Sequence, residues 1–197
     1  GQVSWTSSWT GTSVITAAAT GCSGSSSSSH TVTTISTSGD LLYAQARYGG
    51  NENLGAIFHY NVNNGTQAVD ASMSTVYTGA YVSWTVMTDG GNGKFYGVTR
   101  NGGFYDKGVI FEWDPSSNIY TKLYDFATAT GSEPTGSLAL YSGKLYGMTY
   151  TGGTNNLGTI FEFTLSPNPY TKKFDFAGTQ GKSPQGSLTY YTGKFYG

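Results

Sequence analysis

Two stretches decide the fold of this chain, because they match almost element by element. Residues 92–126 read NGKFYGVTRNGGFYDKGVIFEWDPSSNIYTKLYDF, and residues 142–176 read SGKLYGMTYTGGTNNLGTIFEFTLSPNPYTKKFDF. A diverged copy, SGDLLYAQARYGGNENLGAIFHYNVNNGT, begins at Ser38, and another copy opens with TGKFYG at residues 192–197. One tyrosine per copy marks the register, at spacings of 53, 50 and 50 residues: Tyr43, Tyr96, Tyr146 and Tyr196. A period of about 50 residues lies in the range of β-propeller blades.

Each copy divides into four strands by the alternation of apolar and polar residues and by the placement of glycine. For the copy that contains Tyr146, the expected strands are residues 137–141, 144–150, 159–165 and 170–176. Four antiparallel strands per repeat make one propeller blade. The register then gives blades at residues 31–72, 81–126 and 136–176, and a partial blade at 187–197.

The fold class expected from this pattern is all-β, a partial β-propeller of about three blades and the start of a fourth, over residues 37–197. A propeller ring needs at least four blades to remove its open sheet edges. We therefore expect the ring to be completed by further blades of a parent chain or by a second copy of this chain.

Composition excludes several classes of protein. Ten Lys and Arg against eleven Asp and Glu give a formal net charge of −1, which cannot hold a phosphate backbone, so no nucleic acid partner is expected. No apolar run approaches the roughly 18 residues of a membrane helix, so no membrane insertion is expected. Cys22 is the single cysteine and cannot form a disulfide or a cysteine-based zinc site alone. Abundant Ser, Thr, Tyr and Gly favour an extracellular or cell-surface bacterial protein by association.

The repeat pattern resembles a known family. The motif GKLYGMTYTGGTNNLGTIFEFT, followed by YTKKFDF and GKSPQGSL, is similar to the Gloeo/Verruco-type tandem repeat, and the likeness covers about residues 38–197. This resemblance implies an extracellular bacterial β-propeller repeat, and it carries over no catalytic residues. The first copy departs from the motif, because GAIFHY replaces GTIFEF and residues 73–80 replace the Pro-Gly loop.

Residues 1–36 differ from the repeats. The segment VSWTSSWTGTSVITAAATGCSGSSSSSHTVTT alternates Thr and Val around a Gly-Cys turn, and it resembles the closing strands of PKD-like, immunoglobulin-like modules in Bacteroidetes-type surface proteins. Such a sandwich needs about seven strands in about 100 residues, so this segment is expected to be its end. Extra strands on the propeller are the alternative, and the serine run at residues 25–29 fits a flexible linker.

Four residues are candidates to face a ligand: Trp84, Trp113, Glu112 and Glu162. Glu112 and Glu162 occupy equal positions of successive blades, so they could line a channel, but simple strand alternation favours a structural role. Equal positions also lack the different environments that a pair of catalytic carboxylates needs. Both tryptophans could form a glycan platform, although a core role is favoured for each.

The remaining polar motifs favour structure over chemistry. Asp125 and Asp175 recur at the end of the fourth strand and are expected to order a neighbouring turn. The Gly-Gly pairs after the second strand are expected to form turns, and residues 89–93 a hairpin turn instead of a calcium loop. His30 and His59 lie in different contexts and support neither a metal cluster nor a catalytic triad. No catalytic residue, cofactor or metal is therefore expected.

The sequence favours a non-catalytic structural, adhesive or interaction module, whose partner is a surface glycan or a protein. Repeated blades form a rigid support, and their loops can vary to bind partners. Two alternatives remain open: a carbohydrate-binding or carbohydrate-active propeller domain, and a propeller that is completed by self-assembly. Convergence of unrelated carboxylates or exposed aromatic residues on one face would distinguish the carbohydrate-active alternative.

Overall fold

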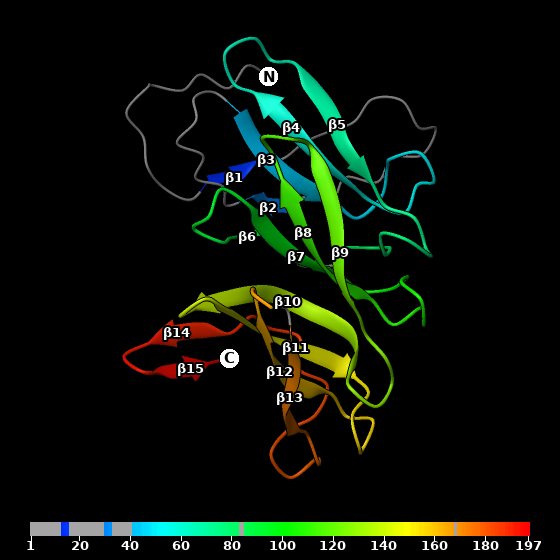
Figure 1. Ribbon diagram of the computed structural model, residues 1–197, viewed down its shortest axis with the longest axis vertical. Helices are drawn as coiled ribbons and strands as arrows, with labels where there is room; N and C mark the ends of the chain where they lie inside the picture. Colours follow the sequence, from blue (N-terminus) through cyan, green and yellow to red (C-terminus); the bar gives the residue numbers. More distant parts are fainter. Residues whose placement is uncertain (1–12, 16–29, 33–40, 83–84, 168) are drawn as a thin grey trace.

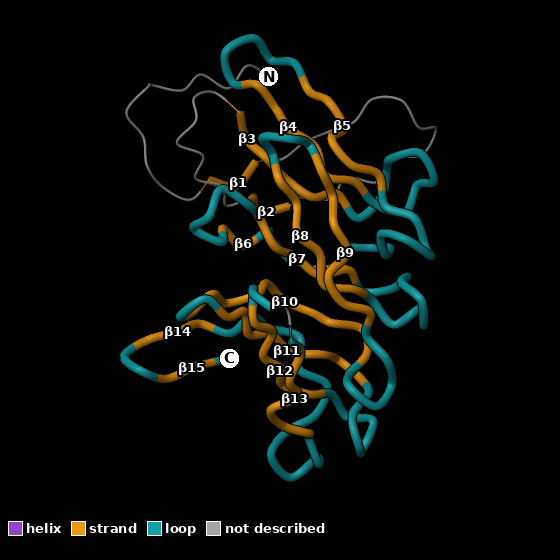
Figure 2. Tube along the Cα trace, viewed as in Figure 1, coloured by secondary structure: helices purple, strands orange, loops and turns teal. Residues whose placement is uncertain are grey.

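Every regular element in the described residues is a β-strand (Figure 2). The computed structural model describes residues 13–15, 30–32, 41–82, 85–167 and 169–197. Small antiparallel sheets follow one another along the chain, and each repeat forms its own sheet (Figure 1). The expected all-β class and the propeller-like blades are confirmed.

Blades 2 and 3 are complete four-stranded meanders. In blade 2 the strands follow the order β6 (Thr88–Asp89), β7 (Phe95–Thr99), β8 (Val109–Asp114) and β9 (Ile119–Asp125). Blade 3 has the order β10 (Ser132–Tyr141), β11 (Lys144–Thr151), β12 (Thr159–Thr164) and β13 (Tyr170–Asp175).

The sheets before and after these blades have fewer strands in the described residues. Blade 1 contains β3 (Leu41–Ala46), β4 (Ala56–Asn61) and β5 (Gln67–Ser72), and the partial blade 4 contains β14 (Thr189–Tyr191) and β15 (Lys194–Tyr196). β2 (His30–Val32), at the expected start of blade 1, pairs with β1 (Ser13–Ile15) in a two-stranded sheet. The serine run and Cys22 lie outside the described residues.

A β-bulge recurs at one place in all three blades. The register between the third and fourth strands shifts after Ile57, Ile110 and Ile160, where one extra residue is inserted in the fourth strand. The extra residues are Asp70, Leu123 and Lys173. A bulge increases the local twist, so its recurrence gives successive blades the same shape.

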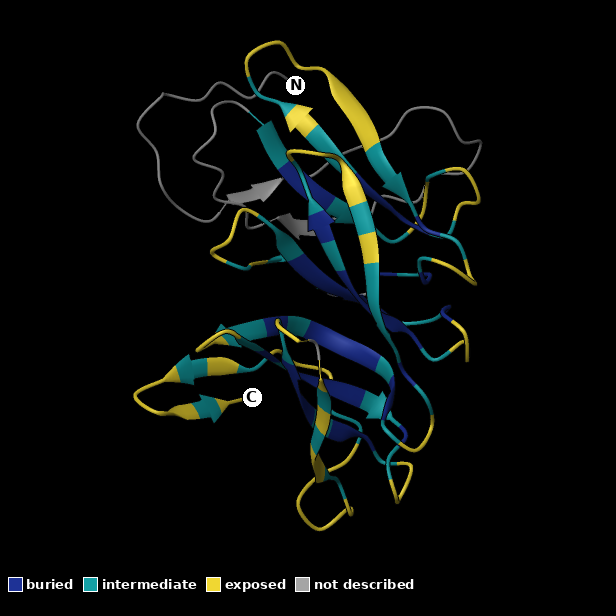
Figure 3. Cartoon of the chain, viewed as in Figure 1, coloured by how far each residue is buried: buried dark blue, intermediate teal, exposed yellow. Residues whose placement is uncertain are grey.

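The cores lie between blades, where the faces of neighbouring sheets meet (Figure 3). Blades 1 and 2 share one cluster, and blades 2 and 3 share a second. The first cluster contains Tyr43, Ile57, Met73, Val82, Met87, Phe111 and Trp113. The second contains Tyr96, Val98, Ile110, Phe126, Leu138, Leu145, Phe161 and Phe163.

Serine side chains join the first strands of successive blades. The Ser137 hydroxyl oxygen accepts a hydrogen bond from the Val86 backbone N–H at 2.8 Å, and the Ser187 hydroxyl oxygen accepts one from the Ser137 N–H at 2.8 Å. A Cβ on Gly136 would lie 2.1 Å from the Gly186 carbonyl oxygen, so the backbones approach here closer than any side chain allows. The first strands therefore pack side by side through one repeated contact.

The loops that join the second and third strands all lie at one edge of the blades, on the right in Figure 1. We call this edge the loop edge, and its loops at residues 49–55, 102–108 and 152–158 the Gly-Gly loops. The segments that connect one blade to the next also lie here, because backbone hydrogen bonds join Ala80 to Asn101 and Thr128 to Gly153. The hairpins between first and second strands lie at the opposite edge.

Candidate binding surface

Glu112 and Glu162 are each held by a lysine and a tyrosine of the neighbouring strand. Lys94 Nζ lies 2.6 Å from Glu112 Oε1, and the Tyr96 hydroxyl donates to Oε2 at 2.9 Å. In blade 3, Lys144 Nζ lies 2.9 Å from Glu162 Oε1, and the Tyr146 hydroxyl donates to Glu162 Oε2 at 2.9 Å. Both carboxylates are thus bonded within their own blades, far along the strands from the loop edge.

Burial and the adjacent Glu162 raise the pKa of Tyr146 to about 12, so its hydroxyl keeps its proton and donates. The hydrogen bond from Lys144 lowers the pKa of Glu162 below its ordinary value, although burial acts in the opposite direction. Glu162 is therefore an ionised anchor at neutral pH and has no character of a general acid.

This ion pair predicts an acid-dependent loss of stability. Because the folded-state pKa of Glu162 lies below its unfolded value, its stabilisation is complete above about pH 5 and is lost as the pH falls through the folded pKa. We expect the melting temperature to fall on acidification from pH 6 to pH 3, and to fall less steeply in Glu162→Gln. Equal slopes in a calorimetric pH series would contradict this role.

Blade 1 has a histidine and an aspartate at the corresponding positions. His59 takes the place of the glutamate, and its Nδ1 lies 2.8 Å from Asp70 Oδ1. Asp70 sits at the bulge position that Lys173 holds in blade 3, where Lys173 Nζ lies 3.8 Å from Glu162 Oε2. The same two positions thus hold a polar pair in both blades, His59 with Asp70 and Glu162 with Lys173, although the residues differ. This indicates a structural contact. His30 is in β2, which pairs with β1.

Trp113 lies in the core between blades 1 and 2 instead of on the surface. Its exposed fraction is 1%, and its ring packs against Tyr43 at 4.8 Å and Phe95 at 6.0 Å between centroids. The indole N–H donates to Asn118 Oδ1 at 3.3 Å. A side chain this buried has no free face for a sugar. Trp84, the other proposed platform, lies outside the described residues.

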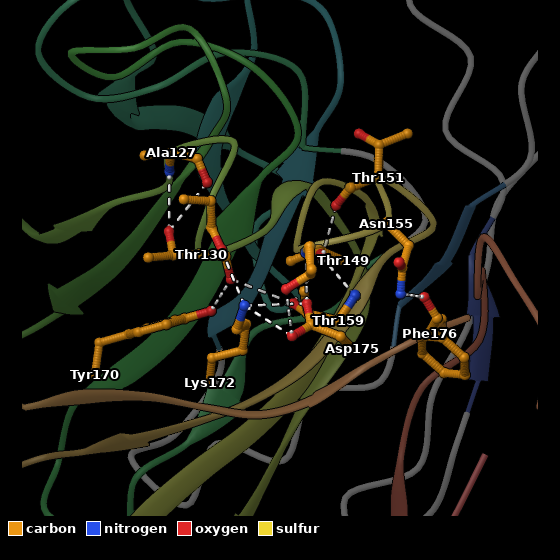
Figure 4. A network of polar contacts seen from close by, with 12 residues as sticks. Ala127, Thr130, Thr149, Thr151, Asn155, Thr159, Tyr170, Lys172, Asp175 and Phe176 are labelled. Atoms are coloured by element: carbon orange, nitrogen blue, oxygen red, sulfur yellow. Dashed lines mark hydrogen bonds and ion pairs between the residues drawn. The ribbon is translucent and has the colours of Figure 1, made fainter.

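Asp125 and Asp175 hold the Gly-Gly loops of their blades. Asp125 Oδ1 accepts from the Phe104 N–H at 2.7 Å, and Asp175 Oδ1 accepts from the Thr154 N–H at 2.8 Å and from Lys172 Nζ at 3.0 Å (Figure 4). Burial raises the pKa of Asp175, but these hydrogen bonds outweigh it and leave the pKa below its ordinary value. Each aspartate thus orders a neighbouring loop, as its place in the repeat predicts.

A second side chain closes each Gly-Gly loop from within. Its Oδ1 accepts from the N–H of the first loop glycine at 2.8–3.0 Å, and its own backbone is left-handed, with φ of 52–57°. These side chains are Asn53, Asp106 and Asn156. The three loops therefore share one conformation, although their other residues differ.

The sequence analysis did not single out Tyr120 and Tyr170, which occupy equal positions in the fourth strands. The Tyr170 hydroxyl donates to the Thr130 carbonyl at 2.6 Å (Figure 4), and the Tyr120 hydroxyl donates to the Thr78 carbonyl at 2.5 Å. Burial raises the pKa of both phenols, so both remain donors. Each bond ties the outer strand of a blade to the segment that leads into that blade. The motif YTK recurs at residues 120–122 and 170–172, and this repetition could have marked both tyrosines in the sequence.

Residues 89–93 form the hairpin turn between β6 and β7. Asp89 Oδ1 accepts from the Gly91 N–H at 2.8 Å, and Asn92 Oδ1 accepts from the Lys94 N–H at 3.2 Å. Within the part of the chain that the structure describes, no three His, Cys, Asp or Glu side chains gather as a metal site would require.

The tips of the Gly-Gly loops differ between blades. Residues 51–52 are Asn-Glu in blade 1, residues 104–105 are Phe-Tyr in blade 2, and residues 154–155 are Thr-Asn in blade 3. Phe104 and Tyr105 are 74% and 56% exposed, and their rings meet edge to face at 4.9 Å. Two aromatic side chains are thus exposed on the loop of blade 2, although the same backbone conformation carries small polar residues in blade 3.

A second variable position lies before or at the start of the first strand of blades 2, 3 and 4, and it is left-handed without being glycine. Tyr81, Glu133 and Ser183 have φ of 55°, 53° and 50°, and the N–H of each donates to a carbonyl of the preceding Gly-Gly loop at 2.7–2.9 Å. A left-handed non-glycine residue costs about 1–2 kcal/mol, which glycine would avoid. Such outliers cluster where side chains are used.

Glu133 is used in an ion pair beside a small pocket. Arg100 donates to Glu133 Oε2 from Nε at 3.1 Å and from one terminal nitrogen at 2.7 Å, and its guanidinium lies 5.6 Å from the centre of the Tyr150 ring. A pocket of about 130 Å³ is lined by Arg100, Thr135, Tyr150 and Gln185. It lies at the loop edge, between blades 2 and 3 and the start of blade 4.

The comparisons with known proteins give one result. The model of the Gloeobacter/Verrucomicrobia repeat matches residues 31–197, which includes all the blades. No curated protein matches the chain. Among the described residues, no helix is long and apolar enough to cross a membrane.

Proposed function

Because this chain belongs to the Gloeobacter/Verrucomicrobia repeat family, we propose that it is a non-catalytic interaction module of an extracellular or cell-surface bacterial protein. The blades form the support, and the loop edge holds the partner, a surface glycan or a protein. In the same proposal, residues 1–36 are the end of an immunoglobulin-like module, which the pairing of β1 with β2 supports.

One observation carries this proposal: the repeats keep their framework and vary their loop edge. The contacts of Glu162 and Asp175 recur in blade 2 as those of Glu112 and Asp125. The loop tips differ completely while their backbones match. Variation confined to exposed positions of a rigid support is the arrangement that binding proteins use.

Blade 2 and the segment that leads into it expose four large apolar side chains at the loop edge. Phe104 and Tyr105 share the loop edge with Val76 and Tyr77 of the segment leading into blade 2, which are 54% and 76% exposed. We call these four residues the aromatic patch. The corresponding residues of blade 3 are polar or small: Thr128, Ala129, Thr154 and Asn155. Blade 3 folds in the same way without exposed apolar side chains at these positions, so the fold does not require them. Exposed apolar patches of this kind indicate contact with a partner.

The absence of catalysis in this proposal is supported by the carboxylates. Glu112 and Glu162 each have one lysine nitrogen at 2.9 Å or less and one tyrosine hydroxyl at 2.9 Å, and Glu162 has Lys173 at 3.8 Å in addition. A general acid and a general base need environments that separate their pKa values. Repetition instead gives each of these two glutamates a lysine and a tyrosine partner within its own blade.

The aromatic patch predicts that adhesion depends on Phe104 and Tyr105. The double variant Phe104→Thr with Tyr105→Asn installs the blade 3 residues, which the same loop conformation already accommodates. We expect fluorescent beads coated with the chain to adhere to some of a panel of immobilised polysaccharides and glycoproteins, and the double variant to weaken this adhesion at least about tenfold.

The matched control is Tyr191→Asn, which removes a 67% exposed tyrosine of β14, away from the aromatic patch, and should leave adhesion unchanged. Adhesion that survives enzymatic removal of the glycans identifies a protein partner, and adhesion that is lost identifies a glycan. Failure of the beads to adhere to any surface, or equal adhesion of the double variant, would refute the proposal.

A carbohydrate-binding role is the second candidate, and a different observation favours it. The pocket beside Arg100 and Glu133 combines an aromatic ring with several hydrogen-bonding groups in a small volume. Sites for small ligands have this combination.

A further inference from the structure

We propose that the pocket lined by Arg100, Thr135, Tyr150 and Gln185 binds one uncharged sugar unit. This inference rests on the proposed function and names the ligand class of its loop edge. We call this site the rim pocket. It is distinct from the aromatic patch, because none of its four lining residues belongs to the patch, which consists of Val76, Tyr77, Phe104 and Tyr105.

The size of the rim pocket limits its occupant. Its volume is about 130 Å³. Pockets for larger organic ligands measure about 300–1,000 Å³. The rim pocket therefore accepts one ring-sized group, with the rest of any longer molecule outside it.

The charges of the rim pocket cancel. The lining Arg100 forms a two-point ion pair at 2.7 and 3.1 Å with Glu133 beside the pocket, and this pair neutralises its charge. A carboxylate ligand that approaches Arg100 also meets Glu133, and an ammonium ligand that approaches Glu133 meets Arg100. An uncharged ligand is repelled neither by Glu133 nor by Arg100.

The hydrogen-bonding groups of the rim pocket suit hydroxyls. Among the residues that the structure describes, Glu133 Oε1 beside the pocket, the amide of the lining Gln185 and the hydroxyl of the lining Tyr150 have no hydrogen-bond partner. They offer a pure acceptor, a group that both donates and accepts, and a phenol that does both. A sugar hydroxyl donates and accepts at once, so adjacent hydroxyls can use all three. The Tyr150 ring supplies an apolar surface for the carbon side of a sugar ring.

The rim pocket is fixed before a ligand arrives. The Glu133 N–H donates to the Lys107 carbonyl at 2.9 Å, and the Thr135 hydroxyl donates to the Pro184 carbonyl at 2.9 Å. The Tyr150 ring lies beneath the guanidinium at 5.6 Å. Groups that are already ordered lose little entropy on binding, which favours a small ligand.

The repeat explains why this site is placed between blades 2 and 3. Arg100 and Tyr150 occupy equal positions of successive blades, as do Thr135 and Gln185. Ser183 holds the position of Glu133 in the following connection, and there a serine cannot form an ion pair. The combination of arginine, glutamate and tyrosine therefore arises at this junction through differences between repeats.

The test is titration of the folded chain by saturation-transfer NMR with methyl glucoside, methyl galactoside and methyl mannoside. Glucuronate and glucosamine serve as the charged counterparts. We expect at least one neutral glycoside to bind, and the charged sugars to bind at least tenfold more weakly. Gln185→Ala removes an exposed side chain with no structural hydrogen bond, and we expect it to weaken binding about three- to tenfold.

Glu133→Gln tests the charge argument, because the variant should gain affinity for a negatively charged sugar. It keeps the shape of the side chain and leaves Arg100 unneutralised, so we expect glucuronate to bind this variant more tightly than the neutral glycoside. A misfolded variant cannot acquire a new ligand. Binding of none of the three glycosides, equal affinity for neutral and charged sugars, or an unchanged preference in Glu133→Gln would overturn the inference.

The double variant Phe104→Thr with Tyr105→Asn separates this inference from the proposed function. It alters only the aromatic patch, so glycoside binding in the rim pocket should remain. If beads adhere through the aromatic patch while no glycoside binds, the rim-pocket inference alone fails. If glycosides bind while no surface retains the beads, the adhesive proposal fails and the rim pocket stands.

Discussion

Replacement of Trp113 by alanine should lower the free energy of unfolding by about 3–5 kcal/mol, the range for removal of a large buried aromatic side chain. Trp113 is 1% exposed and packs against Tyr43 of blade 1 and Phe95 of its own blade. Its removal opens a cavity between two blades and leaves Asn118 without its indole partner. Urea unfolding followed by circular dichroism measures the change.

The control is Tyr191→Ala, which removes an exposed aromatic side chain and should change the stability by less than about 0.5 kcal/mol. A typical domain has about 5–15 kcal/mol of stability, so the Trp113 variant could retain little of its fold. A loss below about 1 kcal/mol for Trp113→Ala would contradict its place in the core and restore its candidacy as a ligand platform.

The second large effect concerns Gly147, the glycine of the Leu-Tyr-Gly motif. Gly147 pairs with Phe161 across β11 and β12, and a Cβ at this position would lie 2.5 Å from the Phe161 ring and 2.9 Å from the Leu138 side chain. Gly97 has the same relation to Phe111 in blade 2. We expect Gly147→Val to destabilise the fold by about 1–3 kcal/mol through overpacking.

Gly186→Val is the matched control, because no atom lies within 4 Å of a Cβ built at Gly186 and its backbone is not left-handed. The difference between the two variants, read from thermal unfolding, isolates the overpacking. Equal stability of the two variants would show that the aromatic ring does not require this glycine.

Strands two and three could be predicted almost to the residue. The expected ranges 144–150 and 159–165 compare with β11 (Lys144–Thr151) and β12 (Thr159–Thr164). The alternation of apolar and polar residues marks each strand, and the glycine-rich loop between them marks where the second strand ends and the third begins. Both signals are local in the sequence. The expected first strand, 137–141, covers only the second half of β10, which begins at Ser132 and contains a register shift between Thr135 and Ala139. Pro134 is accommodated since β10 is an edge strand of its sheet.

The candidate site was only partly predictable. Repetition marked Glu112 and Glu162, but their lysine and tyrosine partners depend on the cross-strand register, which the folded sheet supplies. The rim pocket joins residues as far apart as Arg100 and Gln185, and no local pattern reports such a meeting. The available signal was variation between repeats at equal positions.

The central claim is that the repeated residues build the support and the variable loop edge binds the partner. Hydrogen exchange of the chain, with and without the polysaccharide or glycoprotein that retains the coated beads, tests it most directly. The account predicts slower exchange at residues 102–105 and 133–135, with no change in the hairpins at residues 90–93 and 142–143. Protection confined to those hairpins, or spread evenly over all blades, would contradict it.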